Sequence, residues 1–169
     1  MNIKDWWYAY KVCKKYGIRW KPFCNLKNAT FHVEWSGSVR NIIKSTININ
    51  PFYPNFLTVF MHEVGHCRLY KRGVAQRLYT CAEYSRKFER ESIYLGGKLL
   101  LPLLVEESLA SRFSRKALRG RANVAYLVSG YQTYSAAGYN ELLHTTAEDA
   151  RTITRLTDFV EKGIRRIER

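Results

Sequence analysis

Residues 55–72 read NFLTVFMHEVGHCRLYKR and contain the pattern H-E-x-x-H at positions 62–66. The chain has four histidines, and two of them stand four positions apart beside a glutamate. Pro51 and Pro54 interrupt the preceding extended run, and Gly73 follows the stretch. These prolines and this glycine predict a helix of about residues 55–72, with Asn55 as its cap. The alternative is that the motif is an ordinary solvated helix face.

On such a helix His62 and His66 project from one face, because four residues advance it by about one turn. Both imidazoles can then bind one metal ion at about 2.0–2.1 Å, and Zn²⁺ suits nitrogen ligands of this kind. Glu63 is rotated by about 100° from His62. It would lie beside the ion without binding it, in position to act as a general base. Gly65 predicts that a second helix packs closely against this one.

A catalytic zinc site requires a third protein ligand, and the segment LLVEESLASRFSRKAL (103–118) offers two neighbouring candidates. Glu106 and Glu107 both lie on a predicted helix of about residues 101–119. We favour Glu107, because its neighbours on the helix face are small and allow close packing over a metal. Glu106 lies in line with larger side chains and stays as the alternative ligand.

The remaining chain predicts an α+β protein, with a small antiparallel sheet packed on a helical bundle that carries the H-E-x-x-H helix. No internal repeat or flexible linker divides the chain, so residues 1–169 are expected to form a single domain. Alternating apolar residues and Ile- and Thr-rich composition indicate strands, whereas periodicity of three to four indicates helices. The expected elements are a helix over 4–16, strands over 29–35 and 39–50, and helices over 75–94, 101–119, 122–137 and 146–168. The N-terminal helix and the sheet thus occupy about residues 1–50, and the C-terminal helices occupy about residues 122–168. The aromatic residues of the first helix are expected in the core rather than on a base-stacking surface.

H-E-x-x-H followed by Glu107-Ser108-Leu109-Ala110-Ser111-Arg112-Phe113 resembles the small zinc metallopeptidases of the gluzincin type, especially ImmA/IrrE-like and minimal gluzincin domains. The resemblance covers about residues 43–113. It implies a zincin-like fold, peptide-bond hydrolysis with Zn²⁺ as cofactor, and Glu107 as third ligand. It also implies that the strand containing Ile47, Asn48 and Ile49 is a sheet edge that binds an extended peptide substrate.

Several residues near the end of the chain are candidates for stabilising the negative charge that develops during hydrolysis. His144 lies in YNELLHTT, and Tyr131 and Tyr134 precede it. Imidazole and phenol groups can donate hydrogen bonds to an oxyanion. Packing is the alternative role for each, since aromatic residues are frequent in this chain.

The chain is strongly basic, with 28 Lys and Arg against 14 Asp and Glu and a formal net charge of +14. Runs of cations occur at residues 11–21 and in SRFSRKALRGR (111–121). Such a surface is either simply solvated or attracts polyanions such as nucleic acid. The second functional hypothesis is therefore a nucleic-acid-associated protein on a zincin scaffold, acting on DNA-bound proteins. Salt-dependent binding separates the two hypotheses.

No segment has the roughly 20 apolar residues of a membrane span, and no signal peptide is evident. Cys13, Cys24, Cys67 and Cys81 are scattered without a C-x-x-C pair, which favours buried free thiols over disulfides or a zinc cluster. These features predict a cytoplasmic protein, and its small size suits a gene of a virus or mobile element.

Overall fold

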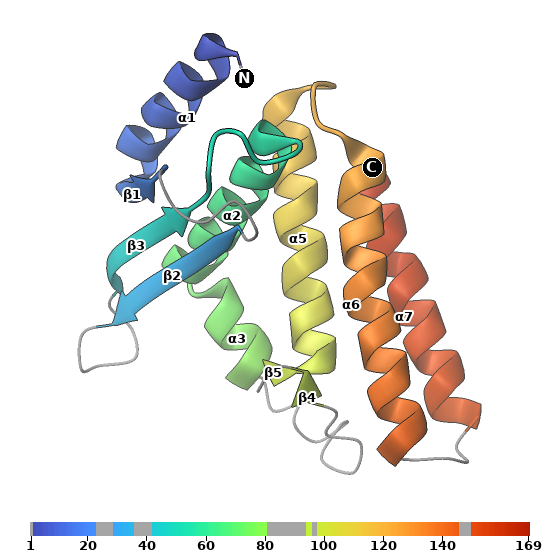
Figure 1. The fold of residues 1–169 in the computed structure, drawn as a ribbon. Helices are drawn as coiled ribbons and strands as arrows, with labels where there is room; N and C mark the ends of the chain where they lie inside the picture. Colours follow the sequence, from blue (N-terminus) through green and yellow to red (C-terminus); the bar gives the residue numbers. More distant parts are fainter. Residues whose placement is uncertain (1, 23–28, 36–41, 81–93, 96–97, 146–149) are drawn as a thin grey trace.

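The computed structural model describes residues 2–22, 29–35, 42–80, 94–95, 98–145 and 150–169 of the chain. For residues 31–35, 42–43, 79–80, 94–95, 98–99, 141–145 and 150–155 it describes the backbone only. The described part is mostly helical, with a small sheet beside the helices (Figure 1). The elements are α1 (Ile3–Tyr16), β1 (Ile18–Lys21), β2 (Thr30–Trp35), β3 (Ile42–Asn48), α2 (Phe56–Lys71), α3 (Val74–Thr80), β4 (Tyr94–Leu95), β5 (Lys98–Leu99), α5 (Leu100–Leu118), α6 (Val124–Thr145) and α7 (Ala150–Glu168).

The predicted first helix is confirmed as α1, and both its ends follow local capping rules. The Asn2 side chain accepts a hydrogen bond from the backbone N–H of Lys4 at the start. Gly17 ends the helix in the left-handed conformation, with φ of 60°. The Lys71 ammonium donates to the carbonyl of Gly17 at 3.3 Å, so the end of α2 is tied to the end of α1.

The three-stranded sheet has the order β1-β3-β2, and its pairing is mixed. β2 pairs with β3 antiparallel, as predicted, whereas β1 pairs with β3 in parallel. The prediction of a purely antiparallel sheet is therefore wrong. The parallel strands β1 and β3 are connected by residues 22–41, which include β2, and a connection of this length allows parallel pairing.

The predicted edge position of the strand over Ile47, Asn48 and Ile49 is also wrong. In β3, Ile47 is paired with Trp20 on one side and Phe31 on the other, and Asn48 is paired with Lys21 and Thr30. Ile49 follows the strand, and its carbonyl accepts a hydrogen bond from the Trp20 indole at 2.9 Å. Ile47 and Ile49 are fully buried in the core between the sheet, α1 and α2. Their apolar side chains therefore serve packing, and β3 is the central strand because β1 and β2 pair with its two sides.

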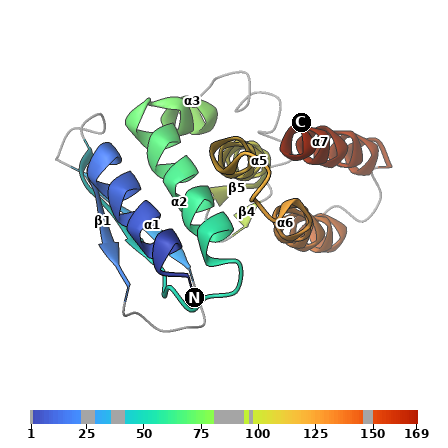
Figure 2. The ribbon, with the colours of Figure 1, turned by 90° about the horizontal axis from the view of Figure 1, so that it is seen from above.

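The H-E-x-x-H helix is α2, and it packs most extensively against α5. Figure 2 shows α2 between α1 and α5. At the crossing, a Cβ added to Gly65 would lie 2.8 Å from both the Cα and the carbonyl oxygen of Ala110. The Ser114 hydroxyl donates to the Thr58 carbonyl at 2.7 Å and holds the two helices together further along. The close approach predicted from Gly65 is confirmed.

We expect Gly65→Ala to destabilise the fold by about 2 kcal/mol, because an added methyl group would force two backbones apart. Gly130→Ala in α6 is the matched control, since no atom of the described residues lies within 4 Å of its added Cβ. Alanine there should leave stability unchanged or raise it, as in other exposed helix positions. Urea unfolding of the metal-saturated proteins measures both effects. Equal stability of the two variants would contradict the close crossing.

The two C-terminal helices differ from the prediction at their junction. The prediction ended the first of them at residue 137, but α6 continues through Gly138 to Thr145. A Cβ at Gly138 would lie 2.6 Å from the Leu100 side chain, so this glycine serves close packing rather than a helix stop. α7 packs on α5 and α6, and Arg166 donates to the buried Ser108 hydroxyl of α5 at 2.7 Å.

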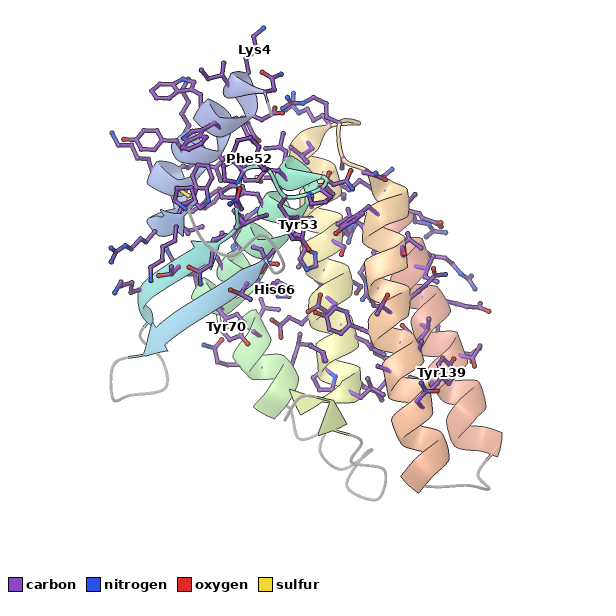
Figure 3. All side chains as sticks on the ribbon, in the orientation of Figure 1. Lys4, Phe52, Tyr53, His66, Tyr70 and Tyr139 are labelled. Carbon is purple, nitrogen blue, oxygen red and sulfur yellow. The ribbon has the colours of Figure 1, made fainter. Side chains whose placement is uncertain are left out.

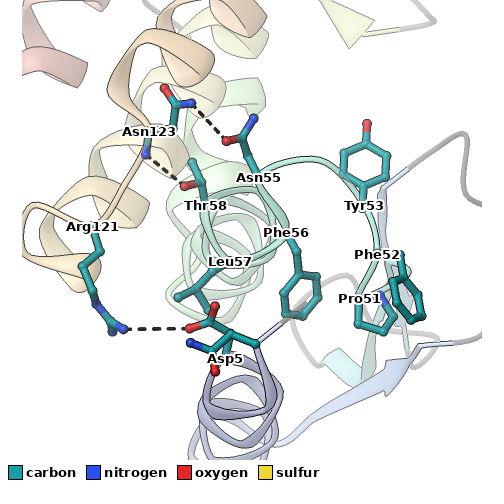
Figure 4. Close-up of a pocket in the computed structure, with 11 residues that line it drawn as sticks. Asp5, Pro51, Phe52, Tyr53, Asn55, Phe56, Leu57, Thr58, Arg121 and Asn123 are labelled. Atoms are coloured by element: carbon teal, nitrogen blue, oxygen red, sulfur yellow. Dashed lines mark hydrogen bonds and ion pairs between the residues drawn. The ribbon is translucent and has the colours of Figure 1, made fainter.

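The start of α2 is joined to the start of α6 beside a pocket of about 500 Å³ (Figure 4). Asn55 takes the left-handed conformation with φ of 54° and makes no capping hydrogen bond with its side chain, contrary to the prediction. Its side-chain oxygen instead accepts from the Asn123 amide at 3.0 Å. The Asn123 backbone N–H donates to the Thr58 hydroxyl at 3.0 Å. These contacts fix the corner between α5 and α6 over α2.

Other predictions about side chains are confirmed only in part. Cys13 and Cys67 are buried free thiols, whereas Cys24 and Cys81 lie outside the described residues. The helix expected over 75–94 corresponds to α3 as far as Thr80, and residues 81–93 lie outside the described part. On α1, Trp6 packs against Trp20, but Trp7 and Tyr10 are exposed, contrary to the expectation that they are core residues. Among the described helices, none is long and apolar enough to cross a membrane.

Candidate metal centre

The structure brings His62, His66 and Glu107 together between α2 and α5, and Figure 3 labels His66 there. The Nε2 atoms of the two imidazoles lie 3.0 Å apart. The Glu107 carboxylate lies 3.1 Å from the Nε2 of His62 and 3.4 Å from that of His66. The choice of Glu107 over Glu106 as the third member of the triad agrees with this geometry.

The other ring nitrogens of both histidines have partners on α5. The Nδ1 of His66 lies 2.8 Å from the Glu106 carboxylate, and the Nδ1 of His62 lies 3.0 Å from the Ser111 hydroxyl. A carboxylate is an acceptor, so His66 donates its Nδ1–H to Glu106. The Nε2 of a neutral His66 therefore carries a lone pair directed at the triad. A carboxylate behind a metal-binding imidazole orients the ring and raises its basicity.

The three ligand atoms fit a small, nitrogen- and oxygen-binding cation. A tetrahedral site with bonds of about 2.0–2.1 Å has ligand atoms roughly 3.3 Å apart. The two Nε2 atoms lie 3.0 Å apart, and each oxygen of Glu107 lies near that spacing from one imidazole: Oε2 is 3.1 Å from the Nε2 of His62, and Oε1 is 3.4 Å from the Nε2 of His66. Three electron-pair donors this close repel one another unless a proton or a cation lies between them. The donor set and its spacing thus fit Zn²⁺.

The charge around the triad is mostly negative and mostly buried. Glu106 and Glu107 are 1% and 7% exposed, and Glu63 is 9% exposed. Burial disfavours a charged His66, but the charge of Glu107 and hydrogen bonds to Glu106 and Glu107 outweigh it and raise the pKa of His66 well above its usual value. Burial acts against an ionised Glu107, yet the charge of His66 and hydrogen bonds from both histidines hold its pKa below its usual value. A divalent cation would balance this cluster better than one protonated histidine.

Glu63 stands next to His62 on α2 and outside the triad. Burial raises its pKa, and the neighbouring carboxylates of Glu107 and Glu106 raise it further, while the two histidines lower it. A buried carboxylate with an increased affinity for protons is the kind of group that serves as a general base. Its place agrees with the position expected from the helix geometry.

Of the two tyrosine candidates for stabilising negative charge, Tyr134 has the hydroxyl whose pKa depends most on the acidic cluster. Its pKa is raised to about 12, first by the charge of Glu107 and then by burial and by Glu63 and Glu106. Tyr134 is also 42% exposed, so its ring faces solvent beside the cluster. For Tyr131, burial is the main cause of a pKa of about 12. A Cβ at Gly163 would lie 2.0 Å from the Tyr131 hydroxyl, so Tyr131 packs between α6 and α7. His144 lies in the last turn of α6, and its side chain is outside the described part.

The sequence pattern identified the triad and Glu63 but not the partners of the imidazoles. Glu106 entered only as an alternative ligand, and Ser111 only as a small neighbour. The adjacency of Glu106 and Glu107 in the sequence was a stronger signal for these partners. Adjacent acids on one helix point about 100° apart, so one can face the triad while the other reaches the far side of an imidazole.

Comparisons with protein-family models, with curated proteins and with solved structures gave no match to this chain.

Proposed function

We propose that the protein is a zinc-dependent metallopeptidase with a zincin-like fold, in which His62, His66 and Glu107 hold the ion and Glu63 acts as general base. The observation that carries this proposal is that the two Nε2 atoms lie 3.0 Å apart with the Glu107 carboxylate against both, while both Nδ1 atoms have partners elsewhere. The resemblance of H-E-x-x-H and the downstream glutamate motif to gluzincin peptidases supports hydrolysis of peptide bonds as the reaction.

The residues around the ion have separate tasks. Zn²⁺ bound there would lower the pKa of a water molecule toward neutrality and polarise a carbonyl group. Glu63 would accept the proton of that water and pass it to the leaving amine. Glu106 and Ser111 would hold the two imidazole rings in the orientation that binds the metal.

Tyr134 supports the same reaction from α6. Its phenol stays protonated at neutral pH, since its pKa is raised to about 12. A protonated phenol at the edge of the cluster can donate a hydrogen bond to the oxygen on which negative charge develops. Tyr131 is buried with its hydroxyl against Gly163 of α7, so it is not placed to donate this hydrogen bond.

The proposal is tested by comparing two neighbouring glutamates. We expect the purified protein to carry about one zinc ion per chain and to cleave an unfolded casein. Glu107→Ala should lose both the metal and the activity, because two histidines alone leave the site with too few protein ligands. Metal content by mass spectrometry of the protein and cleavage of fluorescent casein measure the two properties.

Glu106→Gln is the matched variant on the same turn of α5. It should keep the metal with an affinity about 10- to 100-fold lower, because a glutamine oxygen still accepts from His66 but carries no charge. Greater metal loss in Glu106→Gln than in Glu107→Ala would assign the third ligand to Glu106. Wild-type protein without bound metal would end the proposal.

A further inference from the structure

A groove of about 760 Å³ runs between α1, α2 and α5, and its lining is strongly basic. We call it the basic groove and define it by the cations that line it. None of the described residues that line it is an Asp or a Glu. The cations are Lys11, Lys15, Arg68, Arg112, Lys116 and Arg119.

These cations have no carboxylate partner among the described residues, and three of them, Lys11, Lys15 and Arg68, lie over aromatic rings instead. The Arg68 guanidinium lies 4.4 Å from the centre of the Phe113 ring and 5.5 Å from that of Tyr16. Lys15 lies 5.7 Å from the centre of the same Tyr16 ring. The charge of the basic groove is therefore not neutralised within the described part of the chain, and its potential attracts polyanions.

The basic groove lies on the side of the α2–α5 pair that faces away from the candidate metal centre. On α2, Arg68 follows His66 by two positions, which is a rotation of about 200°. On α5, Lys116 follows Glu107 by nine positions, which brings it to about half a turn from the carboxylate. The contact of Gly65 with Ala110 separates the two surfaces. A ligand in the basic groove would leave the metal centre free.

An exposed aromatic pair extends the basic groove along α1. Trp7 and Tyr10 are 56% and 42% exposed, and their rings stack with centroids 5.5 Å apart and an angle of 18°. Lys11, which lines the groove, lies 5.3 Å from the centre of the Trp7 ring. Flat aromatic faces beside a cationic channel are the features with which proteins bind unpaired bases.

We propose that the basic groove, together with Trp7 and Tyr10, binds single-stranded nucleic acid. The cations would contact successive phosphates, and the two rings would stack on bases. A duplex has the higher charge density, but its bases are already stacked and cannot use the aromatic pair. An acidic peptide would satisfy the cations and leave the rings without a role. The proposal does not depend on the hydrolytic function, since the two surfaces are separate.

The backbone at Arg119 supports a role for its side chain. Arg119 has φ of 45° at the end of α5, in the left-handed region where glycine is favoured. The next residue is Gly120, yet position 119 itself carries an arginine in a conformation that glycine would adopt with less strain. Arg119→Gly should therefore leave the melting temperature unchanged or raised while weakening nucleic-acid binding. A packing role for the side chain predicts a lowered melting temperature instead.

The test measures binding of a fluorescent oligothymidine of about 20 nucleotides by anisotropy at several salt concentrations. The Glu63→Gln protein is used beside wild type and should bind equally well. Six phosphate contacts give a slope of log affinity against log salt of roughly −4. Lys11→Gln with Lys116→Gln should reduce the steepness by about 1.4. The matched control is Lys162→Gln on α7 with Arg169→Gln directly after that helix, and Figures 1 and 2 show α7 on the far side of the molecule from α1.

The aromatic contribution is tested with Trp7→Ala, which should weaken binding by about 5-fold or more. Phe52→Ala is its control, because Phe52 is also an exposed aromatic residue, at 67%, but lies outside the basic groove. A duplex of the same length and a polyglutamate of similar charge should bind more weakly than oligothymidine, and oligouridine distinguishes RNA from DNA. Equal or tighter binding of duplex or polyglutamate, or an unaffected Trp7→Ala, would overturn the proposal.

Discussion

Glu63→Gln should lower the turnover of an unfolded casein by about 10²- to 10⁴-fold while the protein keeps its metal. The glutamine has nearly the shape of the native side chain but cannot accept the proton of an attacking water. Glu63 is outside the triad of His62, His66 and Glu107, so the ion should remain bound. Turnover under saturating substrate and metal content of the same sample measure the two effects.

The same assay separates chemistry from packing on α6. Tyr134→Phe should lower kcat with little change in metal content, because the lost hydroxyl acts on developing charge. Tyr131→Phe removes a hydroxyl that has no hydrogen-bond partner among the described residues, and it should leave kcat nearly unchanged.

Full activity of the Glu63→Gln protein would contradict the role of Glu63 as base. Loss of metal from that protein would show that Glu63 supports the ion instead.

The parts of the fold that could be predicted are those that depend on residues close together in the sequence. The spacing of His62 and His66 determines that they share a helix face, and Gly17 and Gly73 mark helix ends because both take the left-handed conformation. Gly65 predicted a close helix contact because the absence of a side chain matters only where another backbone approaches. The two histidines of the candidate metal centre could be predicted for the same reason, whereas Glu107 lies on another helix and was chosen from the small residues around it.

The parts that could not be predicted depend on distant residues. Nothing local to residues 42–48 shows that β1 pairs with them in parallel and makes β3 the central strand. Gly138 was interpreted as a break, although its role is to admit the Leu100 side chain. Trp7 and Trp6 are adjacent, and only their direction relative to Trp20 determines that Trp6 is half-buried and Trp7 is exposed.

Removal of the metal should destabilise the protein strongly. With free zinc at about a thousand times its dissociation constant, the bound ion contributes about 4 kcal/mol to the free energy of unfolding. For a chain of this size that corresponds to a loss of roughly 10 °C in Tm on chelation. Thermal unfolding with zinc and with a chelator measures the difference. Glu107→Ala is the control, since a protein without the third ligand should show almost no response to chelation.

The effect of chelation should grow as the pH is raised. In the metal-free protein the pKa of His66 is raised above its usual 6.5, so the folded state holds a proton that the unfolded state releases. That contribution is complete below about pH 6.5 and is lost as the pH rises through the folded value. The raised pKa of Glu63 acts in the same direction from its usual 4.5 upward. The lowered pKa of Glu107 matters only when the pH falls below the range of the experiment.

Metal binding has the opposite dependence, because zinc requires a neutral His66 and competes with its proton. Raising the pH from about 6 to about 8 should therefore lower the Tm of the chelated protein relative to that of the zinc-bound protein, so that the difference between them widens. A difference that stays constant or narrows over this range would mean that His66 does not exchange its proton for the ion. The triad would then be an ion pair within the fold, and the hydrolytic proposal would lose its metal.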